Sequence, residues 1–252
     1  MISEIYHIVF YQPLHNGLVF LTNILPFNDL GLAIIILTLF VRFVLFPLSH
    51  KSIITQRKIK NIEPEITKIK EKHKKNKEEI ARKTMALYKE HGISPFSGFL
   101  MIFIQLPVFI ALFILLKNGA NLDDPNVLYS FIKVPENINT LFLGLVDLSK
   151  SSLVVSVLAG LSQFLQIKLS MPKIEKQKPG KSFKDDLQRS MGIQMKYVMP
   201  IFIVFIAQRL SSGIALYWTV SNVFAILHEI AVSKKSDGLV KKIDDGGENS
   251  NN

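Results

Sequence analysis

Apolar residues are gathered into five runs along the chain, and basic residues occupy the stretches between them. The first run, 30–48, is close to the ~20 residues that cross a ~30 Å hydrocarbon core as a helix. The runs at 153–169 and 191–207 are short and contain polar residues, so hydropathy alone also allows them to be buried helices of a soluble protein. The runs at 96–116 and 212–232 resemble the first and predict membrane spans.

The distribution of Lys and Arg predicts the orientation of these spans, because basic loops stay on the cytoplasmic side. Basic residues crowd segments 51–90 and 168–189, whereas the first 41 residues contain none. The loop at 117–152 has nearly balanced charges. We therefore predict an all-α polytopic membrane protein with five transmembrane helices, its N-terminus outside and its C-terminus in the cytoplasm.

The same patterns predict the segment boundaries. An amphipathic extracytoplasmic segment at 1–29 precedes the first span, and a cytoplasmic helical hairpin joins the first two spans. An extracytoplasmic loop, a cytoplasmic loop and a disordered cytoplasmic tail complete the chain. The spans are expected at 30–50, 96–117, 151–169, 191–208 and 212–232, the hairpin at 51–95, the loops at 118–150 and 170–190, and the tail at 233–252.

The hairpin is predicted because apolar residues recur at helical spacing on both sides of the polar stretch 71–79. Pro64 is expected to start or kink a turn in its first arm. Such a basic hairpin is either a solvated link between two spans or a docking arm, and the sequence favours neither.

The charge and composition restrict the possible partners. The net charge is +10, but its excess lies in the two cytoplasmic loops, so anionic lipids, ribosomal RNA and acidic client segments are expected partners and DNA is not. The chain has no cysteine, which excludes disulfides, thiolate metal sites and a cysteine nucleophile.

Three fragments imitate catalytic motifs without the required spacing. Gly180–Ser182 would end a phosphate-binding loop, but Glu175 stands where its first glycine is required. The HE pair at 228–229 lacks the second histidine of a zinc motif, because position 232 is Val. Phe164 replaces the final glycine of a nucleophile elbow. We predict no enzyme activity, no cofactor and no metal site.

Arg42 is the most informative polar residue, because it lies about seven residues, or roughly 10 Å, inside the end of the first run at Ser49. A cation at such depth costs about 2.5–3.5 kcal/mol on insertion scales. Its side chain can snorkel to the interface, but intramembrane charges generally face a bundle interior or a hydrated cavity. No acidic residue lies within the first four runs, and Glu229 is near the cytoplasmic end of the fifth.

Further polar side chains lie at membrane depth. Each one alone is typical of a contact between helices. Together with Arg42 they predict a hydrated groove. These residues are Thr38, Gln105, Gln163, Gln166 and Asn222.

Several short motifs follow one another in a characteristic order. They are ILTLFVR at 36–42 with PL at 47–48, MALYK at 85–89 with SPFSG at 94–98, QLP at 105–107, MP at 199–200, SGIALYW at 212–218 and SN at 221–222. In this order the chain resembles the YidC/Oxa/Alb membrane protein insertases over roughly residues 30–232, in their short form without a large extracytoplasmic domain. It departs from the family pattern at Ser94, Ser211 and Trp218, where Asn, Pro and Tyr are found.

The resemblance implies an insertase and chaperone of the prokaryotic cytoplasmic membrane, with Trp218 added to the client-binding groove. Its clients would be nascent membrane proteins, and the Sec translocon, the signal recognition particle receptor and the ribosome are candidate partners. Two alternatives stay open. An assembly factor would work only with the Sec channel, and a transporter or channel subunit would show internal repeats or a paired intramembrane acid.

Overall fold

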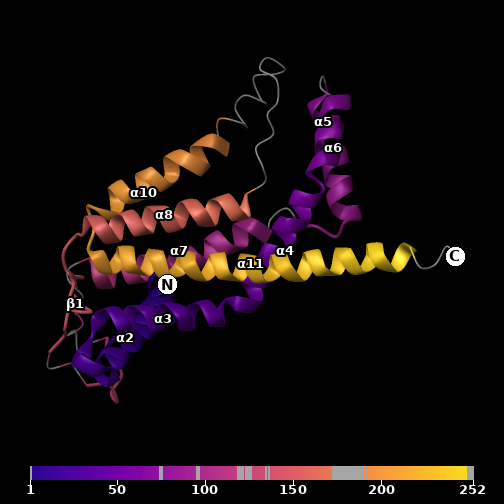
Figure 1. The fold of residues 1–252 in the computed structure, drawn as a ribbon. Coiled ribbons are helices and arrows are strands. Elements are labelled where there is room, and N and C mark those ends of the chain that lie inside the picture. Colours follow the sequence, from indigo (N-terminus) through magenta and orange to yellow (C-terminus); the bar gives the residue numbers. More distant parts are fainter. Residues whose placement is uncertain are drawn as a thin grey trace.

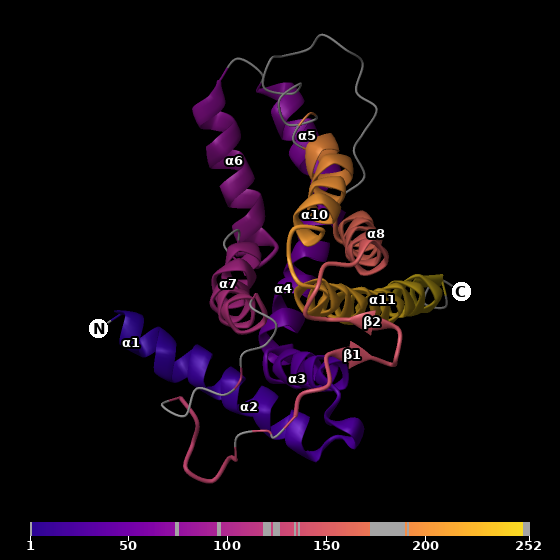
Figure 2. The same cartoon turned by 90° about the vertical axis from the view of Figure 1, so that its left-hand side faces the viewer.

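The computed structural model describes residues 2–73, 76–94, 97–117, 122, 127–133, 135, 137–171, 190 and 192–248. Most of these residues are helical, so the prediction of a helical protein is confirmed. Four long helices run side by side and form the body of the molecule (Figures 1 and 2). They are α3 (Leu30–Val44), α7 (Ser97–Leu116), α8 (Leu153–Ser170) and α11 (Ser212–Glu248).

The N-terminal segment forms a chain of short helices against this body. It comprises α1 (Ile2–Tyr6), the π-helical turn η1 (His7–Tyr11), α2 (Gln12–Ile24) and the 3-10 turn η2 (Pro26–Asn28). The wide turn η1 leads into Pro13, whose ring nitrogen cannot donate to the carbonyl of the preceding helical turn. The apolar face of α2 packs with α3, α7 and α11 in the largest core, through Leu14, Leu18 and Val19.

The first predicted span is broken. Helix α3 ends at Val44, and α4 (Phe46–Asn61) continues at an angle of 67° to it, so the segment 30–50 is bent near its end, while its role as a span stays a prediction. Pro47 causes the break, because it has no N–H for the carbonyl of Phe43 and its ring clashes with that turn. Leu45, between the helices, has φ −83° and ψ 0°.

The polar segment after α4 forms two packed helices, α5 (Glu63–Lys72) and α6 (Lys77–Glu90), which project from the body (Figures 1 and 2). Pro64 lies in the first turn of α5, where its missing N–H costs no hydrogen bond. A small separate core holds the two helices together through Ile62, Ile66, Leu87 and Ile93.

A two-stranded antiparallel hairpin covers the start of α3. Strands β1 (Leu141–Phe142) and β2 (Val146–Asp147) pair with Phe142 opposite Val146. The Asp29 carboxylate caps α3 by accepting a bond from the Leu32 N–H at 3.0 Å. Gly31 lets the Phe142 ring rest on the helix backbone, since a Cβ at Gly31 would lie 2.1 Å from the ring. The hairpin and α3 therefore form one unit.

Helix α8 packs between α11 and α10 (Met199–Ala207), which follows the π-helical turn η3 (Gln194–Val198). The approach is close at Gly160, where a Cβ would lie 2.2 Å from Val204 Cγ2. Pro200 explains the wide turn before it, because Pro donates no hydrogen bond to the preceding turn.

Helix α8 and the Ser212–Ser233 part of α11 are each long and apolar enough to cross a membrane, and the bent pair of α3 and α4 makes a third span if counted as one. Within the described residues, Gln105–Leu116 and Gln194–Ala207 form shorter apolar helices. The count of five spans therefore stays a prediction.

The structure describes only parts of three predicted segments, the tail and two of the loops. Helix α11 continues to Glu248, through most of the segment 233–252 that was expected to be disordered. The remainder of that tail, most of the predicted loop 170–190 and parts of the loop 118–150 lie outside the described residues.

Candidate functional site: a polar cavity between the long helices

A cavity of about 470 Å³ lies between α3, α4, α7, α8 and α11. We call it the polar cavity, because most of its lining side chains carry oxygen or nitrogen. The predicted site residues Arg42, Gln105, Gln163, Gln166, Trp218 and Asn222 all line it. The other polar lining residues are Ser49, Ser52, Gln56, Ser170, Tyr217, Ser221, His228 and Glu229.

Arg42 lies in the last turn of α3, just before the break, and is half-buried. A cation is favourable there, since the carbonyl end of a helix carries partial negative charge. Tyr217 on α11 lies near Arg42, and both side chains line the polar cavity. Among the described residues, no carboxylate forms an ion pair with Arg42. Within the described residues, the Arg42 guanidinium therefore has no carboxylate that neutralises its charge.

Gln105 and Tyr217 join two walls of the polar cavity. The Gln105 side-chain amide of α7 donates a hydrogen bond to the Tyr217 hydroxyl of α11. Tyr217 is almost fully buried, whereas Gln105 is half-buried. This contact fixes the phenol beside Arg42.

The wall formed by α8 carries a row of amides. Gln163 donates to Gln166 at 3.4 Å, and Gln166 donates to the Ser170 hydroxyl at 3.2 Å. The Asn222 amide of α11 donates to the Ser162 hydroxyl of α8 at 3.1 Å and so joins the two helices. These bonds leave amide oxygens and hydroxyls with unused bonding capacity, which a water or a peptide group can take up.

Thr38 is the one predicted site residue that does not line the polar cavity. Its side chain is buried, and its hydroxyl donates to the carbonyl of Ile34 at 2.6 Å. Thr38 is one helical turn from Arg42, but its short side chain satisfies its own helix and stays in the core.

Trp218 contributes an aromatic edge to the polar cavity. Its ring centre lies 5.5 Å from that of Phe109 on α7, with the planes tilted by 53°. Both rings line the cavity, so aromatic side chains accompany its polar ones.

Two contacts join α4 to α11 at the end of the polar cavity next to α4. The Arg57 Nε donates to the Glu229 carboxylate at 3.0 Å, and its Nη2 donates to the backbone carbonyl of Glu229 at 3.1 Å. His228, the residue before Glu229, forms the second contact, in which His50 Nδ1 and His228 Nε2 lie 3.1 Å apart. We call these four residues the α4–α11 clasp.

Tyr217, Ser221, His228 and Glu229 were missed as site residues, although their spacing contained a signal. With Trp218, Asn222 and Ala225 they recur every three or four residues and so form one stripe on α11. The stripe shows which face of the helix is polar, but not that α4 packs beside it.

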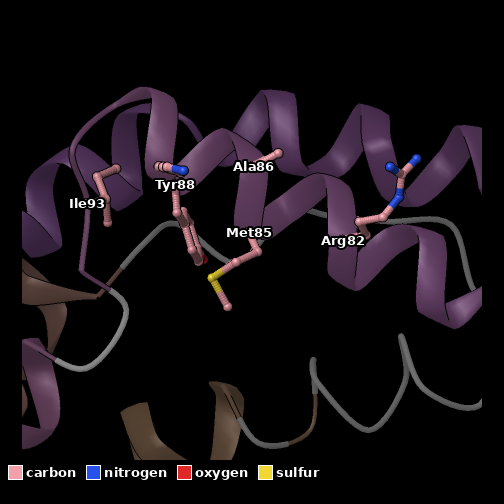
Figure 3. Close-up of a pocket in the computed structure, with 6 residues that line it drawn as sticks. Arg82, Met85, Ala86, Tyr88 and Ile93 are labelled. Atoms are coloured by element: carbon pink, nitrogen blue, oxygen red, sulfur yellow. The ribbon is translucent and has the colours of Figure 1, made fainter.

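A second, shallower hollow of about 540 Å³ lies on α6 in the projecting helix pair. Met85 and Tyr88 point to the same side of α6 there, while the Arg82 guanidinium points away (Figure 3). This hollow is mostly apolar, and it lacks the converging polar groups of the polar cavity. Within the described residues, no group of three metal-ligating side chains comes together.

Apolar helices of membrane-spanning length that enclose a polar cavity define a helical membrane protein. The model of the 60Kd inner membrane protein family matches residues 20–239, and the chain belongs to this family. The resemblance inferred from the motifs is thereby confirmed. Family membership and the apolar helices together indicate a protein of the bacterial inner membrane.

Three relatives are each named membrane protein insertase YidC. The protein of Fusobacterium nucleatum is 33% identical over 227 residues, which cover 89% of this chain and 97% of the relative. The protein of Clostridium tetani is 30% identical, over 83% of this chain and 84% of the relative. That of Wolinella succinogenes is 31% identical over 81% of this chain, but over only 33% of its own length.

Proposed function

We propose that this protein inserts newly made membrane proteins into the bilayer and assists their folding, with the polar cavity as the binding site for the client's hydrophilic segment. The observation that carries the proposal is Arg42, a half-buried cation without a described carboxylate partner, surrounded by amides and hydroxyls. The names of the relatives, which cover most of this chain, support the same function.

The proposed arrangement in the membrane has five spans, with the N-terminus outside and the α5–α6 pair in the cytoplasm. The excess of Lys and Arg in 51–90 and 168–189 supports this orientation. The polar cavity then opens toward the cytoplasm at the clasp, with Arg42 deeper in the membrane.

An acidic or polar client tail would enter the polar cavity and replace water contacts with bonds to Gln105, Gln163, Gln166 and Asn222. Carrying a polar group through such a lined cavity costs less than carrying it through hydrocarbon, where it has no partner. The aromatic residues Trp218 and Phe109 would face the client's apolar helix.

Insertion would be driven by the client itself, without nucleotide hydrolysis. Its apolar helix gains about 25 cal/mol for each Å² of apolar surface that leaves water. The protein lowers the barrier for the polar tail, and the client's helix supplies the free energy.

The proposed partners are nascent membrane proteins, together with the Sec translocon, the signal recognition particle receptor, the ribosome and anionic lipids. The basic residues of 51–90 support contacts with anionic surfaces. The α5–α6 pair projects far enough from the body to meet such partners (Figure 1).

The test is reconstitution of the purified protein in liposomes. A short single-span client with an acidic N-tail is synthesised in their presence, and its protection from protease is measured. Protection above that in empty liposomes supports autonomous insertion. No protection by correctly folded protein contradicts it and favours an assembly factor that needs the Sec channel.

A further inference from the structure

The polar cavity contains one carboxylate among its described lining residues, that of Glu229. Glu229 follows Tyr217 by 12 positions on α11, which is roughly 18 Å along the helix. It therefore lies toward the α4 end of the cavity, away from the Tyr217 side where Arg42 is. A client tail entering at the clasp meets Glu229 first.

Arg57 neutralises the Glu229 carboxylate from outside the polar cavity. It is not among the residues that line the polar cavity, yet its Nε donates to Glu229 Oε1 at 3.0 Å. The Arg57 and Glu229 side chains are 19% and 8% exposed, so solvent screens the pair less than it would on an open surface. With Glu229 neutralised, the cavity is positive through Arg42, which has no carboxylate partner among the described residues.

We propose that Arg57 determines the charge specificity of the polar cavity, by masking Glu229 so that acidic client tails can enter. This role rests on the proposed insertase function. In the absence of Arg57, Glu229 remains as an uncompensated negative charge at the entrance and repels a negatively charged tail. Arg57 is thus a positioning residue that acts through Glu229.

A purely mechanical role for Arg57 makes different predictions. Its Nη2 also donates to the backbone carbonyl of Glu229 at 3.1 Å, so Arg57 joins α4 to α11 even without the carboxylate. Glu229→Gln removes the charge but keeps this backbone bond. In combination with Arg57→Gln, which removes both bonds, the substitution therefore separates charge masking from the mechanical link.

The experiment uses the full chain in liposomes and three clients that share one apolar helix and differ only in an acidic, uncharged or basic N-tail. We expect Arg57→Gln to reduce protection of the acidic-tailed client about three- to tenfold, with the uncharged-tailed client within about twofold of wild type. Arg57→Gln combined with Glu229→Gln should restore protection of the acidic-tailed client to within about twofold of wild type.

Arg82→Gln is the matched control. It removes the same positive charge, and Arg82 likewise pairs with a glutamate, Glu79 on α6. Neither residue is among those that line the polar cavity. It should leave all three clients unchanged. Circular dichroism and size-exclusion profiles establish that each variant is folded.

Equal losses for all three clients with Arg57→Gln, or no recovery in the double variant, would overturn the masking role and leave Arg57 as a mechanical link. These outcomes differ from failure of the proposed function, in which the wild-type protein itself protects no client.

Discussion

The imidazole rings of His50 and His228 meet edge to edge. Their planes differ by 3°, their centres are 5.4 Å apart, and Nδ1 of His50 lies 3.1 Å from Nε2 of His228. The difference between these two distances corresponds to two ring radii, so both nitrogens lie on the line between the centres. One proton between them makes a hydrogen bond, whereas a proton on each breaks it. The ring lone pairs point at each other and do not converge on a metal.

The clasp should therefore loosen when this hydrogen bond is removed. Because one hydrogen bond contributes ~1 kcal/mol, we expect the opening of α4 amides to increase about fivefold in His50→Phe and in His228→Phe. Hydrogen exchange of residues 46–61 in nanodiscs, corrected for intrinsic rates, measures it. The double variant should open little more than either single variant, since both remove the same bond. Unchanged exchange in the single variants would contradict the prediction.

Arg42 should matter for function and not for stability. Arg42→Ala removes the cation of the polar cavity, so insertion of an acidic-tailed client should fall at least about tenfold. Arg42→Lys should retain part of the activity, since it keeps the charge but loses the planar fork. The melting temperature of Arg42→Ala should equal or exceed that of wild type, because a costly intramembrane charge is gone. Undiminished insertion by both variants would show that another charge serves the cavity.

Gly31 should be sensitive to any side chain. Gly31→Ala places a Cβ within 2.1 Å of the Phe142 ring, so the hairpin must shift. We expect a loss of about 1–3 kcal/mol in unfolding free energy, the usual effect of overpacking. Combining it with Phe142→Ala should make the added methyl group almost neutral, although Phe142→Ala is itself destabilising. Gly17→Ala, whose Cβ would meet only the terminal methyl of Leu37 at 3.0 Å, is the control. Denaturation in detergent micelles measures each variant.

Acid should weaken the start of α6. A hydrogen bond from Arg82 holds the pKa of Glu79 below its usual range. A lowered pKa in the folded state means that the charged Glu79 stabilises α6 above the unfolded pKa of about 4.3. This stability is lost as the pH falls through the folded pKa. The effect on hydrogen exchange of residues 77–90 should be about twofold or less, since the pair is exposed. Glu79→Gln should abolish it, and an equal acid response in that variant would contradict the assignment.

The sequence predicted the family and the polar residues around Arg42 because both depend on local patterns. Motifs such as QLP at 105–107 and polar residues within apolar runs are visible without a structure. Gln105, Gln163, Gln166 and Asn222 then converge because each lies on a helix face directed inward.

Features that depend on distant contacts were not predictable in this way. His50 and His228 are separated by 178 positions, and Arg57 and Glu229 by 172. Hydropathy also overlooked the break at Leu45, because Pro47 interrupts a helix without changing its apolar character. Thr38 was assigned to the site by its spacing from Arg42, and spacing says nothing about which carbonyl its hydroxyl will bind.

The break at Leu45 makes α4 a lever. From Phe46 to Asn61 the helix extends about 24 Å, so a rotation of about 10° at Leu45 moves its far end by about 4 Å. The α5–α6 pair is attached at that far end. Force applied to this pair would therefore act on the α4–α11 clasp with mechanical advantage, since Arg57 and His50 lie nearer Leu45 than the attachment does.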